Sequence, residues 1–234
     1  MKRIVIALCC MAAVMAMAAQ ESPLRIGVQA GIGMTMSTGS LHDNFGNCAT
    51  FSGGLTADYK RLRLKADVDY GQPSFRNNNI FDVRDATGRD AQINSTASAT
   101  QLGVGVQAGY AVIDKPGLRV TPCAGLYYSH YGWDVNNIEW DKDEHGEDVF
   151  KIKNKEGASL GNANWTASVD IDIKLHSAIS QSLLGTGNMA RTSSWLRITP
   201  WVAQTKHDAC VPPVKGCLVG LTLRYSGMLQ SLGM

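Results

Sequence analysis

The sequence predicts an all-β protein, an eight-stranded antiparallel transmembrane β-barrel. Three observations carry this prediction. Eight segments alternate between apolar and polar residues, the connections between them alternate between short and long, and the polar positions combine small residues with charges of both signs. Alternation sustained over about ten residues is typical of β-strands. Small transmembrane barrels have an even number of strands of about this length.

The first nineteen residues have the layout of a secretory signal peptide. Lys2 and Arg3 precede an apolar run over residues 4–19, which ends in the small-x-small sequence Ala16-Met17-Ala18. We therefore expect cleavage at Ala18 or Ala19. The alternative, a membrane-anchoring helix, is disfavoured because this run is shorter than the ~20 residues needed to span a bilayer.

Residues 20–234 are then expected to form a single barrel domain. Without Lys2 and Arg3, the 22 basic residues of the chain fall to 20, which equals the number of acidic residues. This balance gives no overall basic field for binding nucleic acid. No apolar run after residue 19 is long enough to be a membrane helix, so a membrane-embedded chain must be a closed barrel.

The first four predicted strands cover residues 25–34, 51–59, 62–71 and 101–112. The third, LRLKADVDYG, shows the pattern most clearly, because every apolar residue is followed by a charged or small one. The last four predicted strands cover residues 118–128, 165–175, 194–202 and 218–226. All eight place Val, Ile, Leu, Ala or aromatic residues on one face.

The connections predict short periplasmic turns and long external loops. Residues 60–61 and 114–117 are short, whereas residues 35–50, 72–99, 129–163 and 203–217 are long and fall at the opposite end. The exception is 176–193, which falls at the short-turn end and is long. Either the strands on both sides of it extend beyond the membrane, or the inner side carries a small excursion.

Alternation alone does not say which face meets lipid, because a soluble lipocalin-like barrel would bury the apolar face. The aromatic residues of that face lie at predicted strand ends, as in the two interfacial belts of membrane barrels. They are Tyr59, Tyr70, Tyr110, Tyr128, Trp165 and Tyr225. The five glutamates all lie outside the strands. Both features favour an apolar face that is turned to lipid.

The charges of the polar face are then enclosed in a narrow lumen. Charges buried there must be paired, and an eight-stranded barrel leaves room only for side chains. We therefore predict an internal ion-pair network that fills the barrel. Its members are Arg25, Asp58, Arg63, Lys65, Asp67, Asp69, Arg119, Asp170, Asp172, Lys174, Arg197 and Arg224.

These features together resemble the OmpA/OmpX-like, or "porin family", outer-membrane β-barrels of Gram-negative bacteria. The segments RIGVQAGIG, LRLKADVDYG and LRVTPCAGLYY carry the resemblance, which covers about residues 24–228. It implies a monomer in outer-membrane lipid, placed there by the barrel-insertion machinery and needing no cofactor. One departure is that SGMLQSLGM follows Tyr225, whereas the family commonly ends on a strand-terminal aromatic residue.

Cysteine and histidine give few chemical signals. Cys210 and Cys217 bracket a short loop and would form a disulfide in an oxidising compartment, with two unpaired thiols as the alternative. Ser129 and His130 are strand neighbours that point to opposite faces, so they cannot act together as nucleophile and base. The sequence shows no paired-ligand spacing typical of a metal site.

The function expected from the sequence is structural, or recognition through external loops. An external ligand would meet residues 72–99 and 129–163, because loops on a rigid scaffold commonly carry recognition. We do not expect an enzyme. A membrane-lipid-modifying enzyme and a small-solute channel are the alternatives, and a soluble binder is the least favoured.

Overall fold

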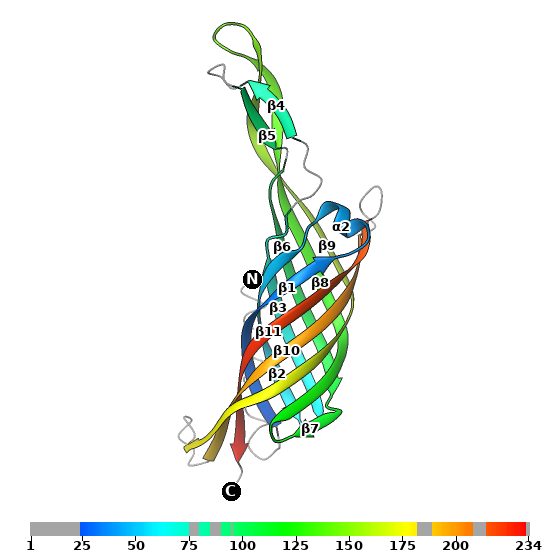
Figure 1. The fold of residues 1–234 in the computed structure, drawn as a ribbon, viewed down its shortest axis with the longest axis vertical. Coiled ribbons are helices and arrows are strands. Elements are labelled where there is room, and N and C mark those ends of the chain that lie inside the picture. Colours follow the sequence, from blue (N-terminus) through cyan, green and yellow to red (C-terminus); the bar gives the residue numbers. More distant parts are fainter. Residues whose placement is uncertain are drawn as a thin grey trace.

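The computed structural model describes residues 24–74, 80–84, 90–94, 96–181, 189–207 and 214–232, most of which lie in one closed β-barrel (Figure 1). Eight long strands form its wall: β1 (Leu24–Ser37), β2 (Cys48–Tyr59), β3 (Leu62–Gly71), β6 (Thr96–Tyr110), β8 (Leu118–Lys142), β9 (Asp148–Gln181), β10 (Met189–His207) and β11 (Val214–Leu232). Each pairs antiparallel with its neighbours along the chain. The pairing of β1 with β11 closes the barrel.

The smaller elements lie at the two ends of the barrel. The helix α2 (Ser40–Asn44) and the hairpin of β4 (Ile80–Arg84) and β5 (Asp90–Asn94) are at the end that we call outer. The short strand β7 (Ile113–Lys115) pairs with the start of β8 at the opposite, inner end. There β2 and β3 are joined by Lys60 and Arg61 alone, and Lys60 has the left-handed φ of 53° that tight hairpin turns require. No helix in the described ranges is long and apolar enough to cross a membrane.

The two faces of the wall differ as the alternation predicts. Outward-pointing apolar side chains are exposed, for example Val28 (64%), Ile32 (61%) and Leu126 (55%). Inward-pointing polar side chains such as Thr56 and Arg197 are buried. A barrel dissolved in water would have the reverse arrangement, with its apolar side chains inside, because exposing apolar surface to water is unfavourable. The predicted fold class, an eight-stranded antiparallel barrel with its apolar face outward, is confirmed.

The strands are longer than the alternation predicts, with the exception of β3. The prediction of a loop over 129–163 is corrected by the structure. The strands β8 and β9 continue through most of this segment and leave a turn of only Asp143–Glu147. At 176–193, β9 runs to Gln181 and β10 begins at Met189, so both strands extend into this segment, as the first alternative expects. In these extensions the ladder of backbone hydrogen bonds is maintained, although neither face of the strands is uniformly apolar. Strand pairing needs only backbone donors and acceptors.

The interior of the barrel has two parts. Charged and hydroxyl side chains occupy the inner part, and an apolar cluster occupies the outer mouth. The members of that cluster are Leu41, Phe45, Ala99, Tyr127, Tyr131, Leu160, Trp201, Ala203 and Leu218. Leu41 and Phe45 come from α2 and the residue after it, so this segment caps the barrel at its outer end.

Candidate functional site: the filled lumen and the external ribbon

Among the described residues, ten charged side chains are buried inside the barrel, and their charges balance. The five cations are Arg63, Lys65, Arg119, Arg197 and Arg224, and the five anions are Asp58, Asp67, Asp69, Asp170 and Asp172. Each has at most 6% of its surface exposed. They come from β2, β3, β8, β9, β10 and β11, so the network ties together strands from all sides of the wall.

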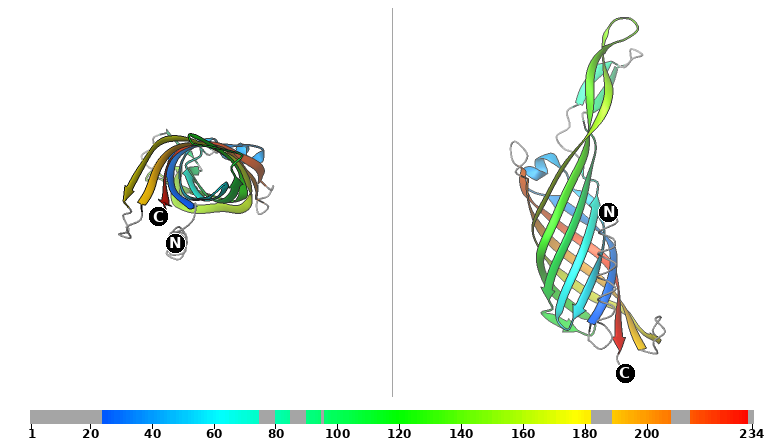
Figure 2. Two further views of the ribbon diagram at one scale, coloured as in Figure 1. Left: turned by 90° about the horizontal axis from the view of Figure 1, so that it is seen from below. Right: turned by 180° about the vertical axis from the view of Figure 1, so that it is seen from behind.

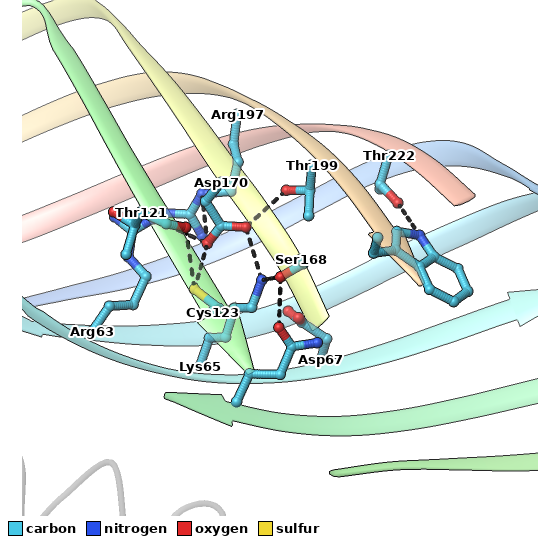
Figure 3. Close-up of polar contacts among 12 residues, drawn as sticks. Arg63, Lys65, Asp67, Thr121, Cys123, Ser168, Asp170, Arg197, Thr199 and Thr222 are labelled. Atoms are coloured by element: carbon cyan, nitrogen blue, oxygen red, sulfur yellow. Dashed lines mark hydrogen bonds and ion pairs between the residues drawn. The ribbon is translucent and has the colours of Figure 1, made fainter. Parts of the chain in front are cut away.

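Asp170 lies at the centre of this network (Figure 3). Its Oδ1 accepts hydrogen bonds from Lys65 Nζ at 2.8 Å and from Thr199 Oγ1 at 3.0 Å, and its Oδ2 accepts one from Arg63 Nη1 at 3.1 Å. Arg197 Nε lies 4.0 Å from Oδ2. One carboxylate on β9 therefore faces cations from both β3 and β10.

A second group of contacts lies closer to the inner end. Arg63 donates to both oxygens of Asp58, from Nε at 2.8 Å and from Nη2 at 3.0 Å. Arg119 Nη1 donates to the same carboxylate at 2.9 Å. Bidentate pairs of this kind fix geometry as well as charge. They hold the start of β8 against the turn between β2 and β3.

Two further groups of ion pairs lie in the lumen. Asp172 pairs with Arg197 and with Arg63. Arg224 pairs with two carboxylates of β3. Arg197 Nε lies 2.5 Å from Asp172 Oδ1, and Arg63 Nη1 lies 2.7 Å from Asp172 Oδ2. Arg224 reaches Asp67 at 3.1 Å and Asp69 at 3.3 Å. Arg197 and Asp172 lie opposite each other on the neighbouring strands β10 and β9. The contacts of Arg63 with Asp172 and of Arg224 with β3 cross the lumen, so they couple strands that are not neighbours in the sheet.

Uncharged polar residues complete the network, and sequence reasoning did not include them. Gln29 donates to Asp67 and accepts from Arg197. Lys65 Nζ donates to Ser168 Oγ at 2.9 Å, which in turn donates to Gln107 Oε1 at 2.6 Å. Their signal in the sequence was their place on the polar face of the alternation.

Two predicted members, Arg25 and Lys174, do not join the ion pairs found among the described residues. Both are half-buried near the inner end of the barrel. The Lys174 ammonium lies 5.9 Å from the centre of the Trp195 ring, beside an irregularity in the β9–β10 pairing at Ser194/Trp195. Without these two cations, the ten buried charges sum to zero.

The network leaves little free space in the lumen. The internal cavity lined by Lys65, Asp67, Gln107, Tyr127 and Arg224 has a volume of about 10 Å³, which is room for about one water molecule. At the outer end, Phe45 stacks on Tyr131 with ring centres 4.6 Å apart and meets Trp133 edge-on at 5.7 Å. Polar side chains therefore plug the inner part of the barrel, and α2 covers the mouth.

The six aromatic residues of the predicted belts all lie on the outer surface, with 42–71% of each side chain exposed. Tyr59 and Tyr110 are the last residues of β2 and β6, and Tyr70 is next to the end of β3. Tyr128, Trp165 and Tyr225 were wrongly expected at strand ends, because β8, β9 and β11 all continue past them. The strands β8 and β9 continue as the external hairpin.

The external ribbon, residues 136–155, is a two-stranded extension of β8 and β9. The pairing of β6 with β8 stops at Thr96↔Val135, whereas β8 and β9 remain paired to Lys142↔Asp148. Figures 1 and 2 show this part rising well beyond the barrel. Seven strand residues at about 3.3 Å each give a reach of about 23 Å.

The tip of this ribbon is strongly acidic. Residues 139–148 contain six acidic residues and one lysine, and the side chains of Glu139, Asp141, Glu144, Glu147 and Asp148 are exposed. The turn is ordered by Asp143, whose Oδ1 accepts from the backbone N–H groups of His145 and Glu147 at 2.8 and 2.9 Å. Gly146 has a φ of 80°, which favours glycine there.

In the described part of the chain, Ser129 and His130 are not brought together. The Ser129 side chain is buried inside the barrel, while His130 lies by Tyr128 with ring centres 6.4 Å apart. Cys48 and Cys123 are buried thiols. Cys210 lies outside the described residues, so the predicted Cys210–Cys217 disulfide stays a prediction. Within the described ranges, no group of three His, Cys, Asp or Glu residues could hold a metal ion.

The sequence matches the family model described as "Autotransporter beta-domain" over residues 14–134, just over half of the chain. Comparison with curated proteins found no match.

Solved structures of low identity resemble the chain. Ail of Yersinia pestis has 8% identity and a TM-score of 0.42, over 88% of this chain and 97% of that one. Neisserial surface protein A has 15% identity and a TM-score of 0.39, over 90% of this chain and 98% of that one. The outer-membrane protease OmpT of Escherichia coli has 10% identity and a TM-score of 0.34, over 89% of this chain and 96% of that one.

The barrel geometry and the family match together define the class of protein. The exposed Val, Ile and Leu side chains of the wall are suited to hydrocarbon, and the paired charges are kept inside. The protein is an outer-membrane β-barrel of the Gram-negative envelope, and its chain belongs to the autotransporter beta-domain family.

Proposed function

We propose that this protein is a surface recognition protein, in which a plugged barrel anchors an acidic ribbon outside the cell. The single observation that carries the proposal is the external ribbon, an ordered hairpin with an exposed acidic turn. The strands that form it are part of the barrel wall, so the tip is held on a rigid base. Loops on such scaffolds commonly carry recognition.

The charge of the tip favours a partner with a cationic surface. Six acids and one lysine within ten residues create a local negative field, which steers oppositely charged partners and weakens with salt. Transport through the barrel is not the proposed role, because the lumen cavity of about 10 Å³ has no room for a solute. The protein then works as a monomer, inserted by the barrel-insertion machinery.

The test of recognition uses four isosteric changes at the tip, Glu139→Gln, Asp141→Asn, Glu144→Gln and Glu147→Gln. The probe is a fluorescent decalysine peptide added to the protein in lipid nanodiscs. We expect affinity to fall roughly tenfold, or about 1.4 kcal/mol, and wild-type binding to weaken as salt rises. Asp114→Asn, at the exposed inner-end strand β7, is the matched control. Unchanged affinity of the four-site variant contradicts the proposal.

Planar bilayers test the plugged lumen directly. We expect the wild-type protein to give no current steps above the bare bilayer, because the lumen is filled by side chains. Discrete conductance steps would favour the channel alternative instead.

We also propose that residues 1–19 are a signal peptide removed on export. Its charged start and apolar run support this. Amino-terminal sequencing of the protein from outer membranes should begin at residue 19 or 20, and a chain that begins at Met1 contradicts cleavage.

A further inference from the structure

A groove of about 520 Å³ lies on the outer surface of the barrel near its inner end. One wall comes from the start of β1, with Ile26 and Val28, and from the last part of β11, with Tyr225 and Leu229. All four point to the lipid side. The volume is in the range of small-molecule sites, ≈ 300–1,000 Å³.

The opposite wall is polar and comes from the ends of β9 and β10. Its members are His176, Thr192 and Ser194. In the view from below in Figure 2, these two strand ends turn away from the ring of the barrel. The pairing irregularity at Ser194/Trp195 lies where they begin to diverge, as expected of a β-bulge.

Gly227 makes the floor of the groove. It stands between the outward-facing Tyr225 and Leu229, and a Cβ added to Gly227 would meet no atom within 4 Å. The outer surface of β11 therefore lacks one side chain at this point. The groove is an open site and not a packing gap between side chains.

We propose that this groove binds one phospholipid of the periplasmic leaflet. The groove is continuous with the apolar surface that meets the membrane, so in the bilayer a hydrocarbon chain fills it. The polar wall lies at the inner end, where headgroups are found. The imidazole N–H of His176 and the hydroxyl of Ser194 can donate to a phosphodiester. Neither side chain has a hydrogen-bond partner within the described part of the chain.

Thr192 contributes differently. Its hydroxyl donates to the Ala178 carbonyl at 3.3 Å, so its oxygen remains able to accept from a headgroup. A second copy of the chain fits this site less well, because the groove is lined by ten residues, whereas a standard interface uses ≈ 20–30 residues on each side.

The test fills the groove. The wild-type barrel and Gly227→Leu are placed in nanodiscs of phosphatidylethanolamine and phosphatidylglycerol, extracted in dodecyl maltoside and weighed by native mass spectrometry. We expect one retained phospholipid on the wild type and roughly tenfold lower occupancy on Gly227→Leu. Gly53→Leu is the matched control, because Gly53 on β2 is also a strand glycine whose added Cβ has only an ordinary contact at 3.7 Å.

A second variant removes the polar wall without filling the space. His176→Leu with Ser194→Ala should also lower phospholipid retention, while heat-modifiable migration on a denaturing gel shows that every variant compared is folded. Equal retention by the wild type, Gly227→Leu and the double variant overturns the proposal. So does a wild type that carries only detergent, or one whose mass doubles without bound phospholipid.

Discussion

Asp170 compensates cations that come from strands on two sides of the lumen. Lys65 and Arg63 on β3 and Arg197 on β10 all lie within 4.0 Å of its carboxylate. Its side chain has no exposed surface, so water cannot replace the carboxylate if it is removed. Removing one partner of a buried ion pair commonly destabilises a protein by 3–5 kcal/mol.

We therefore predict that Asp170→Asn lowers the free energy of unfolding by about 3 kcal/mol. The amide keeps the shape of the side chain but leaves the buried cations in excess. Urea unfolding in lipid vesicles measures the effect. Asp148→Asn, on the exposed ribbon, should be neutral, and equal effects of the two changes would show that the network does not stabilise the barrel.

A second residue-scale prediction concerns the lipid face. Val68 is 46% exposed on the outer surface, so Val68→Arg places a charge in hydrocarbon and should cost ~2–4 kcal/mol. Ile152 is exposed to a similar degree, 47%, but lies on the ribbon outside the membrane. Ile152→Arg should insert like the wild type. Insertion yield into vesicles distinguishes them, and equal yields would contradict the orientation of the barrel.

The sequence could assign residues to a face but not to a depth in the barrel. Alternation placed Asp58, Asp170 and Arg197 on the polar face, and they meet inside. It gave Arg25 and Lys174 the same face, yet both lie near the inner end, where side chains are only half-buried. Depth depends on strand tilt and register, which the alternation of one strand does not contain.

At the scale of elements, α2 and the residue after it form the outer lid. Leu41 and Phe45 have at most 2% of their surface exposed, although their helix has only five residues. A helix this short is not stable alone. Packing on Tyr131 and Trp133 therefore holds it in place.

We predict that Phe45→Ala destabilises the lid, at a cost of about 3 kcal/mol, because the ring stacked on Tyr131 is lost. Limited proteolysis should cut the α2 segment faster, while the barrel remains resistant. The control is Phe51→Ala, whose ring is 67% exposed on the outer wall. Faster cutting of the α2 segment in the control alone would contradict this account of the lid.

The sequence predicted all eight barrel strands, but only β3 with its observed bounds. The other strands continue where neither face is consistently apolar, as in the external ribbon. There the ladder between β8 and β9 persists through backbone hydrogen bonds, and side-chain patterning carries no signal of it. The cap by α2 was also invisible, because one buried Leu and one buried Phe in a loop form no pattern.

At the scale of the whole molecule, the fold depends on closure between the first and last strands. β1 and β11 pair over thirteen residues, from Arg25↔Gln230 to Ser37↔Leu218. At Gly31 they are so close that an added Cβ would lie 2.0 Å from the Leu223 carbonyl oxygen. A side chain at this position requires the two backbones to separate.

We predict that Gly31→Ala weakens closure, so that less protein shows the heat-modifiable migration typical of a folded barrel. Gly53→Ala is the control, since its Cβ would have an ordinary contact at 3.7 Å. Denaturing gels of unheated and heated samples measure the folded fraction. Wild-type migration of Gly31→Ala would contradict the close approach at this seam.

The balance of five buried cations and five buried anions also decides how the barrel responds to voltage. A charge that moves across a membrane gains ≈ 2.3 kcal/mol per 100 mV. Because the plug carries no net charge, a potential difference across the outer membrane exerts no net force on it. Electrical gating would therefore have to separate individual buried charges from their partners.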